Sequence, residues 1–126
     1  MSGADEVMRL GDDLKRSAGE VVGAVRDAMD EAGRNVRDGW REGVRAKAPR
    51  HLPHLPAAIT HETRYTFGGV AVEIGPESGK KQGRLGRGEE LGSVNQPPHL
   101  SGLTAHTAEE PRLERDVADR LGRIIP

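Results

Sequence analysis

Residues 59–74 read Ile59-Thr-His-Glu-Thr-Arg-Tyr-Thr-Phe-Gly-Gly-Val-Ala-Val-Glu-Ile74, and they set the class of the fold. Apolar or β-branched residues alternate with polar ones on both sides of Gly68-Gly69, which is the pattern of two strands joined by a two-residue turn. We therefore predict a β-hairpin over residues 57–75 with one apolar face. A lone hairpin is marginally stable in water, so a helix or further strands must cover that face.

A long helical pattern precedes the hairpin. Apolar residues recur at steps of three or four, on one face of an α-helix, at Val7, Leu10, Leu14, Ala18, Val21, Val25, Met29, Ala32, Val36, Trp40 and Val44. Pro49 ends this pattern, because the residue before a proline avoids helical geometry, and we predict one helix over residues 1–48. Its glycines allow two interpretations. In the first, they are loosely packed surface positions, with a kink near Gly33. In the second, the pairs Gly19 with Gly23 and Gly39 with Gly43 permit the backbone of a partner to approach closely.

Residues 76–92, which follow the hairpin, are rich in glycine and positive charge. Within them, the stretch 78–88 has no acidic residue and four basic ones, Lys80, Lys81, Arg84 and Arg87. We interpret 76–92 as a flexible basic loop. Three readings of its charges stay open: a solvated surface, a contact with nucleic-acid phosphates, and a docking surface for an acidic partner.

Two more segments complete the chain. Residues 93–106 contain Pro97-Pro98, which favours an extended path. Residues 107–126 are predicted to form a C-terminal helix, because Thr107-Ala-Glu-Glu110 has the form of a capping box and Pro111 suits a first turn. The apolar stripe of that helix is Leu113, Val117, Leu121 and Ile124.

These elements predict an α+β subunit, a single domain over residues 1–126 with a long N-terminal helix, a small, mostly antiparallel sheet and a C-terminal helix. The chain has only three aromatic residues, so we expect Val36 and Trp40 to form the core with Tyr65 and Phe67 on the hairpin. A core this thin predicts that contacts between subunits supply part of the stability.

Composition argues against several classes of function. Nineteen basic and twenty acidic side chains leave the chain nearly neutral, which does not favour a free nucleic-acid-binding protein. With no cysteine there is no thiolate for a metal or for catalysis. The N-terminus lacks the features of a signal peptide and no long apolar run occurs, so we expect a protein made in the cytoplasm without a membrane partner.

Motifs for catalysis and cofactors are incomplete. Gly75-Pro-Glu-Ser-Gly-Lys-Lys81 departs from the phosphate-binding loop in glycine spacing and in the residue after Gly-Lys. His51 and His54 are separated by a spacer with a proline, and we interpret the five histidines as solvated or packing residues rather than metal ligands. No nucleophile-elbow pattern surrounds Ser78, Ser93 or Ser101. We expect no cofactor, no metal and no enzyme activity.

Residues 90–100 read Glu90-Leu-Gly-Ser-Val-Asn-Gln-Pro-Pro-His-Leu100. A long helix, an Ala46-Lys-Ala-Pro49 break, a hairpin and a basic loop come before them, and a closing helix comes after. This order resembles the head-to-tail neck and tail-terminator (tail-component, tail-completion) proteins of siphovirus-type, long-tailed bacteriophages. Family members carry an acidic-aromatic-glycine turn and then a proline-histidine segment, and Leu91 stands here where an aromatic residue is frequent.

The resemblance implies a virion protein of the head-tail connector region that takes part in viral assembly. It implies a homo-oligomeric ring, a hexamer, which acts as the tail terminator between the neck connector or stopper protein and the tail tube protein, and which contacts genomic DNA without sequence preference. A head-closure or stopper ring of the same neck is the alternative, and a small DNA-binding or regulatory module is a third. The implied contacts between subunits are Glu90, Leu91, Gln96, Pro97, Pro98 and His99. Those with DNA or a partner ring are Lys80, Lys81, Arg84 and Arg87.

Overall fold

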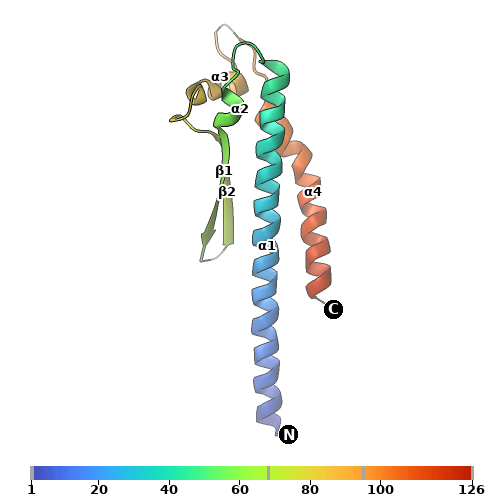
Figure 1. Cartoon of the computed structure of the whole chain (residues 1–126). Helices are drawn as coiled ribbons and strands as arrows, with labels where there is room; N and C mark the ends of the chain where they lie inside the picture. The colour runs from blue at the N-terminus through green and yellow to red at the C-terminus, as the bar shows by residue number, and fades with distance from the viewer. Residues whose placement is uncertain (1, 68, 95, 126) are drawn as a thin grey trace.

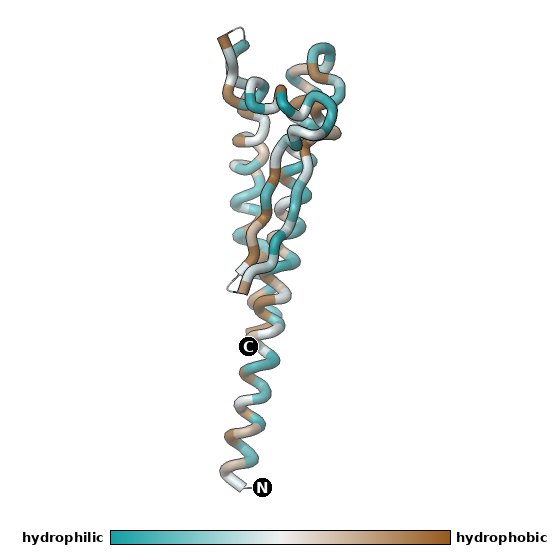
Figure 2. Tube along the Cα trace, turned by 90° about the vertical axis from the view of Figure 1, so that its left-hand side faces the viewer, coloured by the Kyte–Doolittle hydropathy of each residue, from teal (hydrophilic) through white to brown (hydrophobic). Residues whose placement is uncertain are grey.

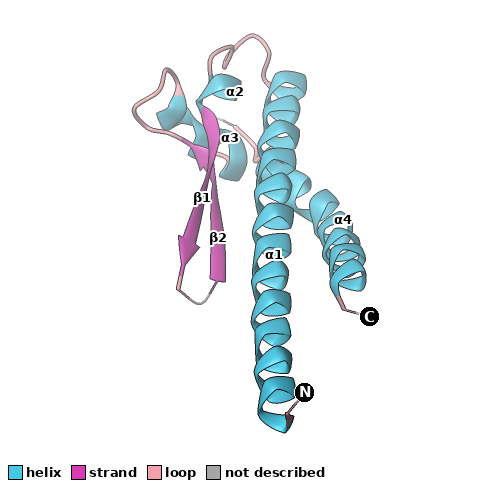
Figure 3. Ribbon diagram, turned by 60° about the horizontal axis from the view of Figure 1, so that its bottom comes forward, coloured by secondary structure: helices cyan, strands magenta, loops and turns pink. Residues whose placement is uncertain are grey.

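The computed structural model describes residues 2–67, 69–94 and 96–125 of the chain. Its elements are α1 (Gly3–Lys47), α2 (Leu55–Ala58), β1 (Ile59–Thr66), β2 (Gly69–Pro76), the 3₁₀ turn η1 (Gly83–Leu85), α3 (Gly86–Leu91) and α4 (Ser101–Ile124). The hairpin and α4 both lie along the C-terminal half of α1, while α2, η1 and α3 gather near its C-terminal end (Figures 1 and 3). The predicted α+β class is confirmed.

Helix α1 is the axis of the molecule. It begins with a capping box, in which Asp5 N donates to Ser2 Oγ at 3.2 Å and Ser2 N donates to Asp5 Oδ2 at 3.4 Å. It ends at Lys47, and Ala48 is its C-cap directly before Pro49. The helix is unbroken at Gly33, which faces the hairpin: a Cβ there would lie 2.5 Å from Val72 Cγ1. Gly33 therefore allows the hairpin to approach the helix.

The hairpin is antiparallel, with Thr63 opposite Val72 and Thr66 opposite Gly69. In this register Gly69 is paired in β2 and Phe67 lies in the turn, so the predicted Gly68-Gly69 turn is shifted; residue 68 lies outside the described residues. The shift keeps the predicted face toward α1. There the Thr63 hydroxyl donates to Asp30 Oδ1 at 2.6 Å, and the Arg26 guanidinium lies 4.7 Å from the centre of the Tyr65 ring.

The prediction that Tyr65 and Phe67 belong to the core was wrong. Tyr65 is 57% exposed and Phe67 is fully exposed, whereas Val36 is buried and Trp40 is half-buried. The cause lies in the direction of the hairpin, whose tip points toward the N-terminal half of α1 (Figure 1). At that level α1 alone packs against the hairpin, so the aromatic side chains near the tip stay in solvent.

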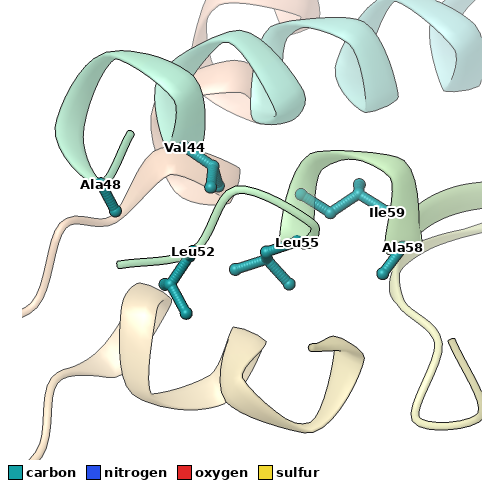
Figure 4. Close-up of a cluster of buried hydrophobic side chains, with 6 residues drawn as sticks. All are labelled: Val44, Ala48, Leu52, Leu55, Ala58 and Ile59. Carbon is teal, nitrogen blue, oxygen red and sulfur yellow. The ribbon is translucent and has the colours of Figure 1, made fainter. Parts of the chain in front are cut away.

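The buried apolar cluster lies at the other end of the hairpin. It consists of Val44, Ala48, Leu52, Leu55, Ala58 and Ile59, with Trp40 packed against it (Figure 4). Four of these residues, Ala48, Leu52, Leu55 and Ala58, come from the connection between α1 and β1. In the sequence that connection has the character of a stiff spacer because of its prolines, but its two leucines are core residues.

Helix α4 runs antiparallel to α1 through a contact built from small residues. A Cβ at Gly39 would lie 3.2 Å from Ala105 Cβ, and one at Gly43 would lie 2.9 Å from Ser101 Cβ. The interpretation of Gly39 and Gly43 as sites of close approach is confirmed, with the partner inside the same chain. Around Gly19 and Gly23 nothing within the described structure comes that close.

Three predicted segments are corrected by the structure. The flexible basic loop over residues 76–92 contains η1 and α3, and the extended segment over residues 93–106 ends at Leu100. The C-terminal helix begins at Ser101, so Pro111 lies inside it and not in its first turn. The earlier start of the C-terminal helix has a physical reason, a cap from a distant part of the chain, which is described below.

Candidate functional site

The proline segment, residues 92–100, is held at both ends by α3. His99 N donates to Glu89 O at 2.9 Å and Leu100 N donates to Glu90 O at 3.1 Å. Inside the segment Ser93 N donates to Gln96 O at 2.8 Å, and Gly92 has φ +82°, where a Cβ would lie 2.8 Å from Pro98 N. The segment therefore folds back on α3, and the prediction of an extended path was wrong at its start, where Ser93 and Gln96 pair across a turn.

Glu90 is the cap that starts α4. Its carboxylate accepts hydrogen bonds from Gly102 N at 2.7 Å and Leu103 N at 2.9 Å. A negative charge at the first turn also complements the helix dipole. These bonds satisfy donors that the helix itself cannot, which is why α4 begins six residues before the predicted capping box. Glu90, predicted as a contact between subunits, is thus used within the chain.

Glu89 is a buried carboxylate that sequence reasoning missed. It is 1% exposed, its Oε1 accepts a hydrogen bond from the Ser101 hydroxyl at 2.6 Å, and His99 Nδ1 lies 3.5 Å from the same oxygen. Ser101 and His99 both contact the same carboxylate oxygen of Glu89. The serine hydroxyl is therefore not hydrogen-bonded to the imidazole, as a catalytic nucleophile requires. Ser101 is also buried. This cluster fixes the junction of α3 and α4.

The remaining residues predicted at subunit contacts form the outer surface of the proline segment. Leu91, Pro97 and Pro98 are exposed, and they line one shallow, open depression together with Gln96 and the rest of the loop. Leu91 is 60% exposed, so this surface offers apolar area to a partner. The structure brings Leu91, Gln96, Pro97 and Pro98 together, while His99 turns inward to Glu89.

All four basic side chains of the predicted loop are exposed. The segment that carries them is held by Gln82, whose Oε1 accepts from His54 N at 2.6 Å, and by Gly83, where a Cβ would lie 1.7 Å from Glu77 O. Arg84 and Arg87 line a second depression with Leu91, next to the proline segment. We name these two depressions together the head face.

Beyond the head face, the N-terminal half of α1 also exposes several apolar side chains. Helix α4 ends well before α1 does, and the hydrophobic positions of α1 continue below the level of the C-terminus (Figure 2). Val7 is 70%, Leu10 59% and Leu14 62% exposed. The sequence predicted this regular apolar stripe and that it is longer than one small hairpin can cover; the structure shows that the N-terminal part is the part left uncovered.

Ionic contacts fix the position of α4 against α1. Arg120 binds Glu31 Oε2 at 3.0 Å and Asp116 Oδ1 at 3.0 Å, and Asn35 Nδ2 donates to Glu109 Oε1 at 3.1 Å. The hydrogen bond to Asp116 raises the pKa of Arg120 further above its usual range. These polar contacts hold the two helices together beside the close approach at Gly39 and Gly43.

On the hairpin side, the hydrogen bond from Thr63 lowers the pKa of Asp30 below its ordinary value, with Arg34 and His61 acting in the same direction. The hydrogen bond from Arg37 likewise lowers the pKa of Asp38. Of the two, only Asp30 ties the middle of the hairpin to α1, since Asp38 is paired within the helix.

Searches for two further kinds of site were negative within the residues described. No three His, Asp or Glu side chains in that part of the chain form a group that could hold a metal ion. Nor does any helix in the same ranges combine the length and the apolar character needed to cross a bilayer. Comparisons of the chain with protein-family models, with curated proteins and with solved structures found no match.

Proposed function

We propose that this chain is a structural subunit of a bacteriophage neck, where a homo-oligomeric ring of six copies acts as the tail terminator between the head connector and the tail tube. The observation that carries the assembly part is the uncovered apolar stripe of α1. An amphipathic helix in water needs a surface that covers its apolar face, and α4 and the hairpin cover only the C-terminal half. The phage part rests on the resemblance of residues 90–100 and of the element order around them.

The head face supports the same proposal. It combines an apolar rim at Leu91, Pro97 and Pro98 with two exposed guanidinium groups, Arg84 and Arg87. Such a surface suits a protein partner or the phosphates of DNA passing through a ring, because contacts with backbone phosphates need charge and no base sequence. In this proposal the chain acts by assembly, not by catalysis, at the head-tail junction of the virion, after synthesis in the host cytoplasm.

Deletion of the gene from the phage that encodes it tests the proposal. A terminator caps the tail tube, so we expect filled heads beside unjoined tails of irregular length in electron micrographs, with infectivity restored by the chain supplied from a plasmid. Antibody labelling of complete particles should mark the head-tail junction. Heads that lose their DNA beside tails of normal length would identify a stopper ring instead, and normal infectious particles would overturn the proposal.

A further inference from the structure

An apolar groove runs along the C-terminal half of α1, between the hairpin and α4. Its floor includes Met29 and Val36 of α1, one wall is Val72 and Ile74 of β2, and the other wall is on α4. The α4 wall includes Leu103, His106, Glu110 and Leu113. Nearer the hairpin tip a second hollow lies between α1 and the hairpin, lined by Val21, Val25, Val70 and Phe67, and we call the two together the groove.

The groove is open because the face of α4 that contacts α1 is not the apolar face of α4. The side chains of α4 that meet α1 are small or charged, such as Ala105 and Glu109. Its own apolar stripe, Leu113, Val117, Leu121 and Ile124, is only half-buried. Apolar side chains of three elements thus border a channel that no described part of the chain fills.

The same chain carries a segment of matching length and character. Residues 3–20 of α1 project beyond α4, and 18 residues of α-helix span about 27 Å. The groove floor from Val21 to Val36 spans about 24 Å on the same scale. Because both belong to one continuous helix, the projecting segment cannot fold back into its own groove. Only a second copy can supply it.

Charge complementarity gives the direction in which the segment lies. In the projecting segment Lys15 flanks the stripe about 100° to one side of Leu14, and Asp13 flanks it about 100° to the other. The groove has Glu110 on its α4 wall and Arg26 on its hairpin side, and Arg26 Nε is buried without a hydrogen-bond partner among the described residues. When the two helices lie parallel with their stripes face to face, Lys15 meets the acidic wall and Asp13 meets the basic side.

We propose that residues 3–20 of one copy occupy this groove of the next copy, parallel to its α1. The contact joins two different surfaces, so repetition proceeds head to tail and closes into a ring when the rotation per subunit allows it. The inference rests on the proposed function, since it names the surfaces by which the subunits of that ring meet.

Cysteine cross-linking of the full-length chain tests the contact, because the chain has no cysteine of its own. The variant Val7→Cys/Phe67→Cys places thiols at the stripe and at the hairpin-tip end of the groove, both exposed in the single subunit. We expect a ladder of disulfide-linked oligomers from it on oxidation. The matched variant Val7→Cys/Leu103→Cys, with its second thiol at the far end of the groove, should give no ladder.

A ladder from the Leu103 variant alone would overturn the parallel arrangement. Dimers from Val7→Cys alone, without a ladder from either double variant, would show that two stripes pair with each other and would overturn the groove as the docking site. A monomer at micromolar concentration in sedimentation would overturn it as well.

A pair of single substitutions gives an independent readout. Leu10 and Met8 are 59% and 69% exposed, but they lie about 160° apart around the helix, so only Leu10 is on the stripe. Leu10→Glu should weaken self-association about tenfold or more, and Met8→Glu should leave it within about twofold, with unchanged circular dichroism in both. Equal effects of the two substitutions would overturn the proposal.

The two proposals fail in different ways. Rings that persist in Leu10→Glu, together with no ladder from Val7→Cys/Phe67→Cys, would overturn the groove contact and leave the neck function standing. A ladder from purified Val7→Cys/Phe67→Cys, combined with normal particles from a phage that lacks the chain, would support the contact and overturn the neck function.

Discussion

Gly102 lies directly against the indole ring of Trp40, so that a Cβ at this glycine would be 2.8 Å from two of the ring atoms. The outer edge of the same ring lies near Gly75 at the end of β2, where a Cβ would be 3.8 Å from Trp40 Cη2. Trp40 thus sits where α1, the hairpin and the first turn of α4 meet. The absence of a side chain at Gly102 is what lets α4 approach.

Gly102→Ala should therefore destabilise the protein, by about 1 to 3 kcal/mol, because the added methyl group overlaps the Trp40 ring and the ring or the helix must shift. Gly122→Ala in the same helix is the control, since nothing lies within 4 Å of a Cβ there. It should stabilise the helix by up to about 1 kcal/mol. Urea unfolding followed by the fluorescence of Trp40 measures both, and equal free energies of unfolding would contradict the contact.

Removal of the Glu90 carboxylate should weaken the start of α4. Glu90→Ala leaves the N–H groups of Gly102 and Leu103 without their acceptor, and the loss of a helix cap costs about 0.5 to 2 kcal/mol. Glu114→Ala, at an exposed position of the same helix, should stay within about 0.5 kcal/mol of the wild type. Hydrogen exchange of the first turn of α4 should accelerate only in Glu90→Ala; protection that is equal in the two variants would argue against this cap.

Asp30 should make stability depend on pH in the acid range. Its pKa is lowered in the folded protein, chiefly by the hydrogen bond from Thr63, so its contribution is complete above the unfolded value of about 4 and is lost as pH falls through the lowered folded value. Asp30→Asn should be less stable than the wild type at pH 7 and converge with it at about pH 2, where both side chains are neutral.

Thr63→Val provides the companion test for Asp30, because it removes the largest cause of the lowered pKa. The difference in unfolding free energy between pH 7 and pH 3 should shrink in this variant relative to the wild type. Thermal unfolding across that range measures it. A pH dependence identical to that of the wild type would show that the Thr63 hydrogen bond does not govern the titration of Asp30.

The four exposed basic side chains between residues 80 and 87 should matter for assembly and not for folding. Replacement of the four by serine, at Lys80, Lys81, Arg84 and Arg87, should change the melting temperature little, since exposed charges contribute little to stability. In a complementation assay the same variant should impair head-to-tail joining or DNA retention. Normal yields of DNA-filled, infectious particles would show that these charges are only solvated surface.

The elements that could be predicted are those specified by neighbours along the chain. The stripe from Val7 to Val44 and the break at Pro49 encode α1, and the alternation around residues 59–74 encodes the hairpin. Both patterns depend on local backbone geometry. The α+β class follows from them, as does the helical character of the C-terminal residues.

Contacts between distant residues decided the rest. Helix α4 begins at Ser101 because Glu90 caps it from another helix, and Glu89 is buried because Ser101 lies beside it; neither relationship leaves a trace in a local pattern. The core formed around Leu52 and Leu55, and not around the aromatic residues of the hairpin, because the fold gathers three elements at one end of α1 only. A periodic pattern states which face of a helix is apolar. Only the packed structure shows how much of that face is covered.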